Sequence, residues 1–190
     1  MKKILIGTHN SGKFKEISFL LSKKIKKISP KSLKIKSPKE TGKSFIANSK
    51  LKARYFSNFS NLPVISDDSG LCIKSLNDKP GIYSARWAKR YGSFFKAMKV
   101  ILKKMKNEKN RSATFVCCLT FISKKKIITT TGKIKGSISY KIKGKKGFGY
   151  DPIFIPLSKS LTFGEMIKSD KMKMDHRYIA FKQLKKRIKI

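Results

Sequence analysis

Acidic residues are scarce in this sequence, which contains 10 aspartates and glutamates against 47 lysines and arginines in 190 residues. The formal net charge is therefore +37, an imbalance typical of proteins that bind nucleic acid. Here, however, the lysines are spread through the whole chain, and Lys, Ile, Phe, Asn and Ser are all abundant. That set favours a coding bias toward A- and T-rich codons over a dedicated nucleic-acid surface. Either interpretation predicts a positive field that attracts polyanions, including triphosphates.

Long apolar runs and a cysteine framework are also missing. No apolar stretch approaches the ~20 residues of a membrane-spanning helix, and the apolar run after the basic start is too short for a signal peptide. The three cysteines, Cys72, Cys117 and Cys118, give neither an even disulfide framework nor a metal-ligand spacing. We therefore expect reduced thiols in the core, no membrane partner and a cytoplasmic location.

The remaining composition suits a single globular domain. A chain of 190 residues that is 39% hydrophobic can bury one core, and no internal repeat is present. Strands are expected at residues 3–7, 33–35, 62–65, 114–122, 126–131 and 134–142. Helices are expected at about residues 14–21, 44–56 and 94–105, after a capping box at 162–165, and from about residue 176. This mixture predicts an α/β or α+β fold with a mixed sheet.

Two helices have apolar spacings that predict their buried faces, and residues 77–90 are expected to form a long loop. The expected buried residues of the second helix are Phe45, Ile46, Ala53 and Phe56. Those of the third are Phe94, Phe95, Met98, Ile101, Leu102 and Met105.

The stretch Val64–Leu71 is where chemistry is expected. An apolar run ends in Asp67 and Asp68, followed by Ser69 and Gly70, which predict a turn. Ligands bind at strand ends in α/β proteins, and two carboxylates there can hold Mg²⁺ or accept a proton from water. The alternative is a solvated turn, because an adjacent acidic pair is a weak motif by itself.

The segment Gly7–Lys13 joins a strand to a helix, where backbone N–H groups and the helix dipole favour an anion. It also fits most of the Walker A pattern G-x-x-x-x-G-K. That pattern continues with Ser or Thr to bind Mg²⁺, whereas this sequence has Phe14. The departure argues against a P-loop NTPase, and an ordinary strand-to-helix turn is the remaining alternative.

Five motifs in one order make the chain resemble the inosine triphosphatase family of non-standard purine triphosphate pyrophosphatases. They are residues 8–16 (THNSGKFKE), 67–71 (DDSGL), 80–86 (PGIYSAR), 147–154 (GFGYDPIF) and 176–177 (HR). The resemblance implies a Mg²⁺-dependent cytosolic homodimer that hydrolyses dITP, ITP or XTP/dXTP to the monophosphate and pyrophosphate. It also implies one domain over residues 1–190, with an elongated mixed sheet flanked by helices and two lobes around a central substrate cleft.

The resemblance also implies roles for individual residues. Asp68 is the expected catalytic proton acceptor, Glu40 and Asp68 are the expected Mg²⁺ ligands, and Asp67 supports them. The expected phosphate-binding residues are Thr8, His9, Asn10, Ser11, Gly12, Lys13, Lys52 and Ser69. The expected base pocket is Phe148, Gly149, Tyr150 and Asp151, with Phe148 stacking on the purine. The expected closing set, which touches base and phosphate, is Lys171, His176 and Arg177.

The sequence departs from the family pattern near its end, where Asp175 precedes His176-Arg177 in place of a serine, and in the second helix, where Ala47 replaces a glutamate. Asp175 could influence base choice by pairing with His176, or it could cap the last helix while facing solvent. Two other functions are open: a basic nucleic-acid-associated protein and a P-loop-like NTPase. A specific nucleic-acid partner is disfavoured because the basic residues are mostly lysine and most aromatics have core spacing.

Overall fold

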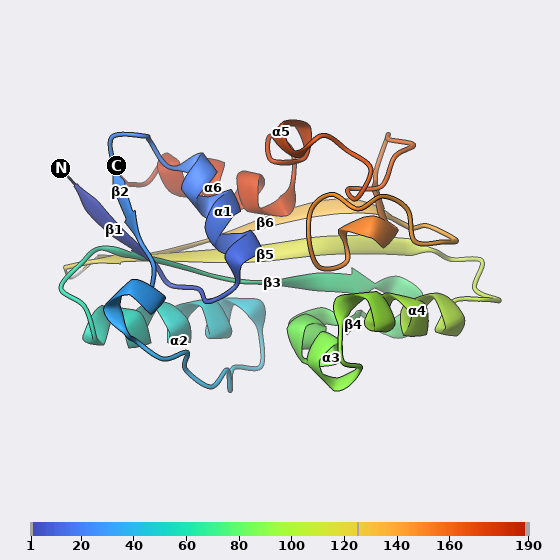
Figure 1. The fold of residues 1–190 in the computed structure, drawn as a ribbon, viewed down its shortest axis with the longest axis horizontal. Coiled ribbons are helices and arrows are strands. Elements are labelled where there is room, and N and C mark those ends of the chain that lie inside the picture. Colours follow the sequence, from blue (N-terminus) through green and yellow to red (C-terminus); the bar gives the residue numbers. More distant parts are fainter. Residues whose placement is uncertain (1, 125, 189–190) are drawn as a thin grey trace. The chain divides into compact units, whose positions relative to one another are not determined.

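A computed structural model describes residues 2–124 and 126–188 of the chain, which form a mixed α/β fold (Figure 1). The strand order in the sheet is β2-β1-β3-β5-β6-β7, and β4 pairs with β3 outside this path. Pairing is parallel for β1–β2 and β1–β3 and antiparallel for β3–β4 and β6–β7. The predicted fold class, a mixed sheet flanked by helices, is therefore confirmed.

The elements have the following bounds. The strands are β1 (Lys3–Ile6), β2 (Lys26–Ile28), β3 (Val64–Ile73), β4 (Lys79–Pro80), β5 (Ser112–Ser123), β6 (Lys126–Ile138) and β7 (Phe154–Pro156). The α-helices are α1 (Ser11–Leu20), α2 (Phe45–Asn58), α3 (Ser84–Arg90), α4 (Phe94–Lys104), α5 (Lys168–Lys171) and α6 (His176–Lys185). Short 3₁₀ turns occur at Lys31–Leu33, Lys74–Leu76, Gly81–Tyr83 and Asp151–Ile153.

The chain forms two compact units, each assembled from segments that are distant in sequence. Unit 1 consists of residues 1–68, 117–132 and 177–190, and unit 2 of residues 69–116 and 133–176. Strands β3, β5 and β6 contribute residues to both units.

In unit 1 the helices cover both faces of the sheet because side chains alternate along each strand. Ile4 and Ile6 of β1 pack in one apolar cluster with Ile17 of α1 and Leu184 of α6. Leu5, between them, belongs to a second cluster with side chains of α2 and β3. Helices α1 and α6 therefore lie on one face of this part of the sheet and α2 on the other (Figure 1).

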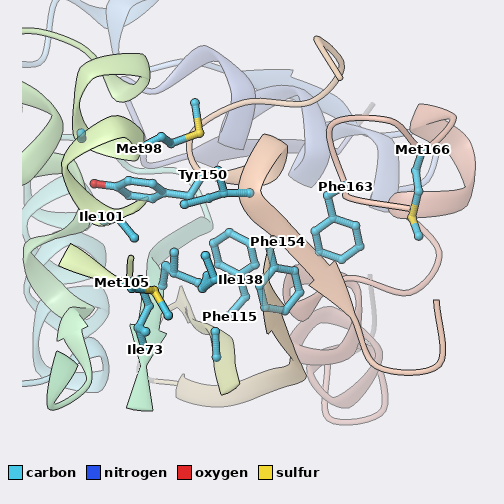
Figure 2. Packing of buried hydrophobic residues seen from close by; sticks show 14 residues of the cluster. Ile73, Met98, Ile101, Met105, Phe115, Ile138, Tyr150, Phe154, Phe163 and Met166 are labelled. Atoms are coloured by element: carbon cyan, nitrogen blue, oxygen red, sulfur yellow. The ribbon is translucent and has the colours of Figure 1, made fainter. Parts of the chain in front are cut away.

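The core of unit 2 is rich in aromatic residues. Helix α4 contributes Met98 and Ile101, which meet side chains of β3, β5, β6 and β7 (Figure 2). Phe115 of β5 and Phe154 of β7 lie at its centre, with their ring centroids 4.6 Å apart. The buried Tyr150 ring joins the same cluster and packs edge-on against Phe94 at 5.2 Å.

The predicted turn at Ser69-Gly70 is wrong, because β3 continues without a break from Val64 to Ile73. Gly70 lies inside the strand, where an added Cβ would collide with the Gly81 carbonyl oxygen and the Ser84 hydroxyl. The glycine therefore permits a close approach of backbone and not a change of chain direction.

Four other local predictions are also wrong. Residues 33–35 form no strand, and β2 lies earlier, at Lys26–Ile28. Residues 77–90 contain β4, a 3₁₀ turn and α3 in place of a long loop. The two strands predicted within residues 126–142 are one strand, β6. The capping contacts of Thr162 with Glu165 do form, at 2.9 Å from the Thr162 N–H to Oε2, but they close a turn and not a helix.

Two residues predicted to be buried are exposed. Ile46 of α2 is 44% exposed and Phe95 of α4 is 51% exposed. The face that α2 buries includes polar residues instead, namely Asn48, Ser49 and Lys52. The cysteines are free thiols, as predicted, and Cys117 and Cys118 are buried. No helix within residues 2–124 or 126–188 is long and apolar enough to cross a membrane.

Truncating two apolar side chains of α4 tests the corrected core. Ile101→Ala should lower the free energy of unfolding by about 2–5 kcal/mol, because it leaves a cavity in the packed core of unit 2. Phe95→Ala should cost under about 1 kcal/mol, since half of that side chain already lies in water. Urea denaturation measures both. Equal losses would contradict the placement of Phe95 outside the core.

Candidate functional site

The segment between β1 and α1 has the geometry of an anion site. Asn10 is the N-cap of α1, and its Oδ1 accepts a hydrogen bond from the Lys13 N–H at 3.0 Å. The Thr8 hydroxyl accepts from the Asn10 N–H at 3.2 Å and so fixes the loop. In the part of the chain that the structure describes, the N–H groups of Ser11 and Gly12 donate to no protein acceptor. Two donors at the positive end of the helix dipole are therefore available for an anion.

His9, in the same loop, is tied to a more distant segment. Its Nε2 lies 3.0 Å from the carbonyl oxygen of Ile35, and its ring centroid is 6.1 Å from that of Phe56. Gly7 permits the loop to leave the sheet here, since an added Cβ would collide with the Ser66 hydroxyl and the Phe56 ring. His9, one of the predicted phosphate-binding residues, thus anchors the loop to Ile35 and Phe56.

Asp67 and Asp68 are adjacent on a continuous strand, so their side chains point to opposite faces of the sheet. Asp67 faces α1 and α6, where its Oδ2 lies 3.1 Å from Lys13 Nζ and 3.2 Å from Arg177 Nη2. Asp68 faces α2, where its Oδ2 accepts from Asn48 Nδ2 at 3.1 Å. The hypothesis that the adjacent pair holds one metal ion is therefore wrong for geometric reasons.

The two carboxylates also differ in acidity. Burial alone would raise the pKa of Asp67, but the charges of Lys13, Arg177 and Lys52 outweigh it and hold that pKa well below its usual range. For Asp68, burial raises the pKa, and the negative charges of Glu40 and Asp67 add to it against the opposing charges of Lys52 and Lys13. Asp67 is therefore a fixed anion, whereas Asp68 is a better proton acceptor than an ordinary aspartate.

Glu40 and Asp68 come from different segments and meet at Lys52. Lys52 Nζ lies 2.7 Å from Glu40 Oε1 and 3.7 Å from Asp68 Oδ1. Burial would lower the pKa of Lys52, but the surrounding carboxylates Asp67, Asp68 and Glu40 raise it. One cation thus already lies within reach of both predicted metal ligands.

The carboxylates of Glu40 and Asp68 are compatible with a Mg²⁺ ion that keeps several of its waters. Mg²⁺ is usually held by one or two carboxylates together with water and substrate phosphates. Within residues 2–124 and 126–188, no group of three or more His, Cys, Asp or Glu side chains is placed to hold a metal. Glu40 and Asp68, both within reach of one cation, could supply two carboxylate ligands, with the other positions left to water and phosphate oxygens.

Two residues of this site were missed by sequence analysis. Asn48 Oδ1 accepts from the Gly42 N–H at 2.8 Å, which directs its Nδ2 toward Asp68. Glu16, one turn after Lys13 on α1, is buried and forms an ion pair with Arg177 Nη1. A signal was present in both helices, since Asn48 with Lys52 and Lys13 with Glu16 occupy neighbouring turns of one helix face. Polar residues on a buried face indicate a site.

Arg177 was predicted to touch base and phosphate. The structure places it in unit 1, where it is 1% exposed and paired with Glu16 and Asp67. Its guanidinium joins α6, α1 and β3 at a fixed geometry. On this geometry Arg177 is linked to the segment between β1 and α1 through Asp67, which also holds Lys13.

The predicted base residues lie in unit 2, around Asp151. Its Oδ2 accepts from the Phe148 N–H at 2.7 Å and pairs with Lys171 Nζ at 2.6 Å. Lys171 Nζ also lies 4.9 Å from the centroid of the Phe148 ring. Asp151 and Lys171 are both buried, so this ion pair fixes the loop that carries the half-buried Phe148 ring.

The other members of the predicted base pocket have different surroundings. Gly149 adopts a φ of +67°, a conformation that glycine permits at low cost. The Tyr150 hydroxyl donates to the Ser84 carbonyl oxygen at 3.0 Å, and its ring lies in the core of unit 2 (Figure 2). Burial raises the pKa of Tyr150. Tyr150 therefore supports the loop that carries Phe148 from within the core.

His176, Asp175 and Ser69 also fall in unit 2. The His176 ring stacks on Phe115 with centroids 4.8 Å apart and planes 10° from parallel. Asp175 is 1% exposed, so the alternative that it faces solvent is wrong. Ser69 directly follows Asp68 in β3. The structure thus groups the phosphate and metal candidates in unit 1 and the base candidates, with Ser69, in unit 2.

Known proteins resemble this chain over nearly its whole length. A family model described as the Ham1 family matches residues 4–187. A dITP/XTP pyrophosphatase of Dictyoglomus thermophilum is 42% identical, covering 96% of this chain and 92% of its own. One from Haemophilus influenzae is 39% identical, covering 98% and 99%. A solved structure of a HAM1 protein from Coxiella burnetii has a TM-score of 0.88 at 32% identity and covers 98% of both chains.

The opposite environments of the two aspartates predict opposite effects on stability. At pH 7, with a chelator present, Asp67→Asn should lower the free energy of unfolding by about 3–5 kcal/mol, because it leaves Lys13 and Arg177 without their shared anion. Asp68→Asn should leave stability unchanged or slightly higher, because burial already disfavours its ionised form. Denaturant titration measures both, with the exposed Asp78→Asn as the matched control.

The loss from Asp67→Asn should depend on pH in a defined direction. The pKa of Asp67 is depressed on folding, so its stabilising effect is present above the usual value of 3.8 and disappears as the pH falls below it. The difference between the wild type and the variant should therefore shrink below pH 3.8. A pH-independent difference would mean that Asp67 stabilises by packing and not by charge.

Proposed function

Because the chain belongs to the Ham1 family, we propose that it hydrolyses non-standard purine nucleoside triphosphates, such as dITP, ITP and XTP/dXTP. The products are the nucleoside monophosphate and pyrophosphate, and the reaction cleanses the nucleotide pool. The proposal rests on relatives named dITP/XTP pyrophosphatase that match nearly the full chain. The observation that carries it is geometric: Asp68 is a buried carboxylate that shares Lys52 with Glu40.

The triphosphate binds to the residues of unit 1. At the N-terminus of α1, the N–H groups of Ser11 and Gly12 donate hydrogen bonds to phosphate oxygens. Lys13 and Lys52 add positive charge, and each is oriented by a carboxylate, Asp67 for Lys13 and Glu40 for Lys52. Because the N–H groups and Lys13 are held in place before the substrate arrives, they stabilise charge on the phosphate oxygens without reorganisation.

Asp68 accepts the proton of the attacking water. A general base works best when its pKa is closer to the working pH. Burial raises the pKa of Asp68 in the metal-free protein, and a Mg²⁺ ion bound to its carboxylate would lower it again. Asn48 Nδ2 donates to one oxygen of Asp68, Oδ2, and the other oxygen, Oδ1, lies 3.7 Å from Lys52 Nζ. Asp68 can thus serve as base and metal ligand, while Asp67 keeps Lys13 and Arg177 in place.

Mg²⁺ is the cofactor that this proposal requires. Bound by Glu40 and Asp68 with phosphate oxygens, it would neutralise charge on the leaving pyrophosphate and acidify water. Lys52 would then turn from the two carboxylates toward a phosphate oxygen. Its flexible stem and single point charge suit that exchange better than a planar guanidinium.

The purine binds to the residues of unit 2. The Phe148 ring supplies a stacking surface held by Asp151 and Lys171. Hypoxanthine and xanthine carry a 6-keto acceptor where adenine carries an amino donor. A pocket of donors rejects adenine by about 1–3 kcal/mol for each buried group left unpaired. Asp175, buried next to His176, is a candidate for contact with a 2-amino group.

A homodimer in the cytoplasm remains a prediction from the family resemblance. Size-exclusion chromatography with light scattering tests the first part of it, and a monomer at all concentrations would contradict it.

Replacing Asp68 tests the assignment of the base. Asp68→Asn should lower kcat for dITP by about 10²–10⁴-fold, the range that general-base catalysis contributes, while its melting temperature stays at or above that of the wild type. Asp78→Asn, the same chemical change at an exposed site, should leave both values unchanged. Near wild-type turnover by Asp68→Asn would remove Asp68 from the catalytic role.

The products and the metal requirement separate the proposal from a P-loop-like NTPase. Hydrolysis of dITP should yield pyrophosphate and dIMP, stop in EDTA and resume when Mg²⁺ is added. Phosphorus NMR of the reaction identifies the products directly. Orthophosphate and a nucleoside diphosphate would instead favour the P-loop-like alternative.

A further inference from the structure

A basic cavity in unit 2 lies outside the proposed catalytic residues. It has a volume of about 480 Å³, and its lining includes Lys109, Arg111, Ser139, Tyr140, Lys141 and Lys143. None of these residues is assigned above to phosphate, metal or base. Cavities of about 300–1,000 Å³ are typical of sites for small molecules, so the cavity is large enough for a nucleotide.

The charge of the cavity is one-sided. Four of its lining residues are cationic and none is acidic. Lys143 acts on an acid outside the lining, because the hydrogen bonds from Thr162 most strongly, and the charge of Lys143 less strongly, lower the pKa of Glu165. Among the residues that the structure describes, no carboxylate lies within salt-bridge distance of Lys109, Arg111 or Lys141. Their charges remain available to an anion.

Arg111 is held rigidly in the cavity wall. Its Nε donates to the Ile138 carbonyl oxygen at 2.6 Å, its Nη1 to that of Met105 at 3.0 Å and its Nη2 to that of Ser139 at 2.8 Å. Three backbone acceptors from two segments thus orient the guanidinium without neutralising it. Such a group binds an anion with little further loss of side-chain entropy.

Tyr140 adds an aromatic surface at the same place. The guanidinium carbon of Arg111 lies 4.2 Å from the centroid of its ring, so the ring is supported on one face. The residue is nevertheless 81% exposed, which leaves the rest of the ring open to solvent. An exposed tyrosine beside cations is the combination that binds a planar base next to its phosphates.

We propose that this cavity is a second ligand site, which binds a nucleoside phosphate with its phosphates on Lys109, Lys141 and Arg111 and its base on Tyr140. The site is distinct from the proposed catalytic residues, so ligand binding there needs neither Mg²⁺ nor a 6-keto purine. It also gives part of the strong positive charge of the chain a specific use.

Binding of ADP in EDTA, at about 150 mM salt to screen distant charges, tests the proposal by isothermal titration calorimetry. The proposed base pocket disfavours a 6-amino purine, and EDTA removes the metal, so both conditions weaken ADP binding at the catalytic residues. Binding at the second site is then identified by the loss that variants of its own residues cause. The double variant Lys109→Gln/Lys141→Gln should weaken ADP binding about tenfold or more. The control Lys23→Gln/Lys24→Gln removes the same charge from exposed positions of unit 1 and should change it less than about twofold.

A second pair of variants separates stacking from charge. Tyr140→Ala should weaken ADP binding about tenfold and leave inorganic tripolyphosphate binding unchanged. Tyr83→Ala removes another exposed tyrosine that lies under an arginine, Arg86, at 4.4 Å and should affect neither ligand.

Three results would overturn the proposal. Absence of ADP binding to the wild type would exclude the site. Equal losses of ADP affinity in the two double lysine variants would mean that ADP is attracted by the overall positive charge of the protein and not by this cavity. A loss of dITP turnover in Lys109→Gln/Lys141→Gln, parallel to the loss of ADP binding, would place these lysines in the catalytic site. Turnover within about twofold of the wild type, with ADP binding lost, supports a separate site.

Discussion

The pleat of one strand governs the arrangement of the candidate site in unit 1. Because β3 continues through Asp67 and Asp68, these neighbours must point to opposite faces of the sheet. One face is covered by α1 and α6 and the other by α2. The two carboxylates of one dipeptide therefore make different direct contacts, and their pKa values shift in opposite directions although Lys13 and Lys52 act on both. A turn at this point would have placed both carboxylates in solvent with similar properties.

Buried charge is used here to fix positions, at a cost in desolvation that the local partners must offset. Asp67 with Lys13 and Arg177, and Asp151 with Lys171, each bring segments from different parts of the sequence to a defined geometry. In both cases the ion pair lies behind a group that faces a ligand in the proposed function, the phosphate loop in unit 1 and the Phe148 ring in unit 2. An apolar pair of similar volume would fill the space equally well, but it would not hold Lys13 or the Phe148 N–H in one orientation.

The sequence predicted most elements correctly where periodicity was strong, as in β1, α1, α2, α4 and α6. The prediction failed where polar residues and glycine could belong either to a turn or to a regular element. Ser69-Gly70 was interpreted as a turn because glycine favours turns, whereas tertiary packing against Gly81 and Ser84 demands the glycine inside a strand. The capping pattern of Thr162 and Glu165 formed its hydrogen bonds without a helix, since such local bonds also close turns. Partners such as Glu16 for Arg177 are 161 residues apart, and no local pattern specifies them.

The scarcity of acidic residues makes their positions informative. In a chain whose composition puts lysine at most tolerant positions, cations lie within salt-bridge distance of five carboxylates in particular: Glu16, Glu40, Asp67, Asp68 and Asp151. Five of the ten acidic residues are buried: Glu16, Asp67, Asp68, Asp151 and Asp175. This is unusual, because Asp and Glu are rarely fully buried unless paired. The same excess of lysine explains why basic residues carry little information singly, and why a cavity becomes noteworthy only when its cations gather around a fixed arginine and an exposed ring. In this chain buried acidic residues indicate the candidate site directly, whereas lysines and arginines indicate a site only where their geometry groups them.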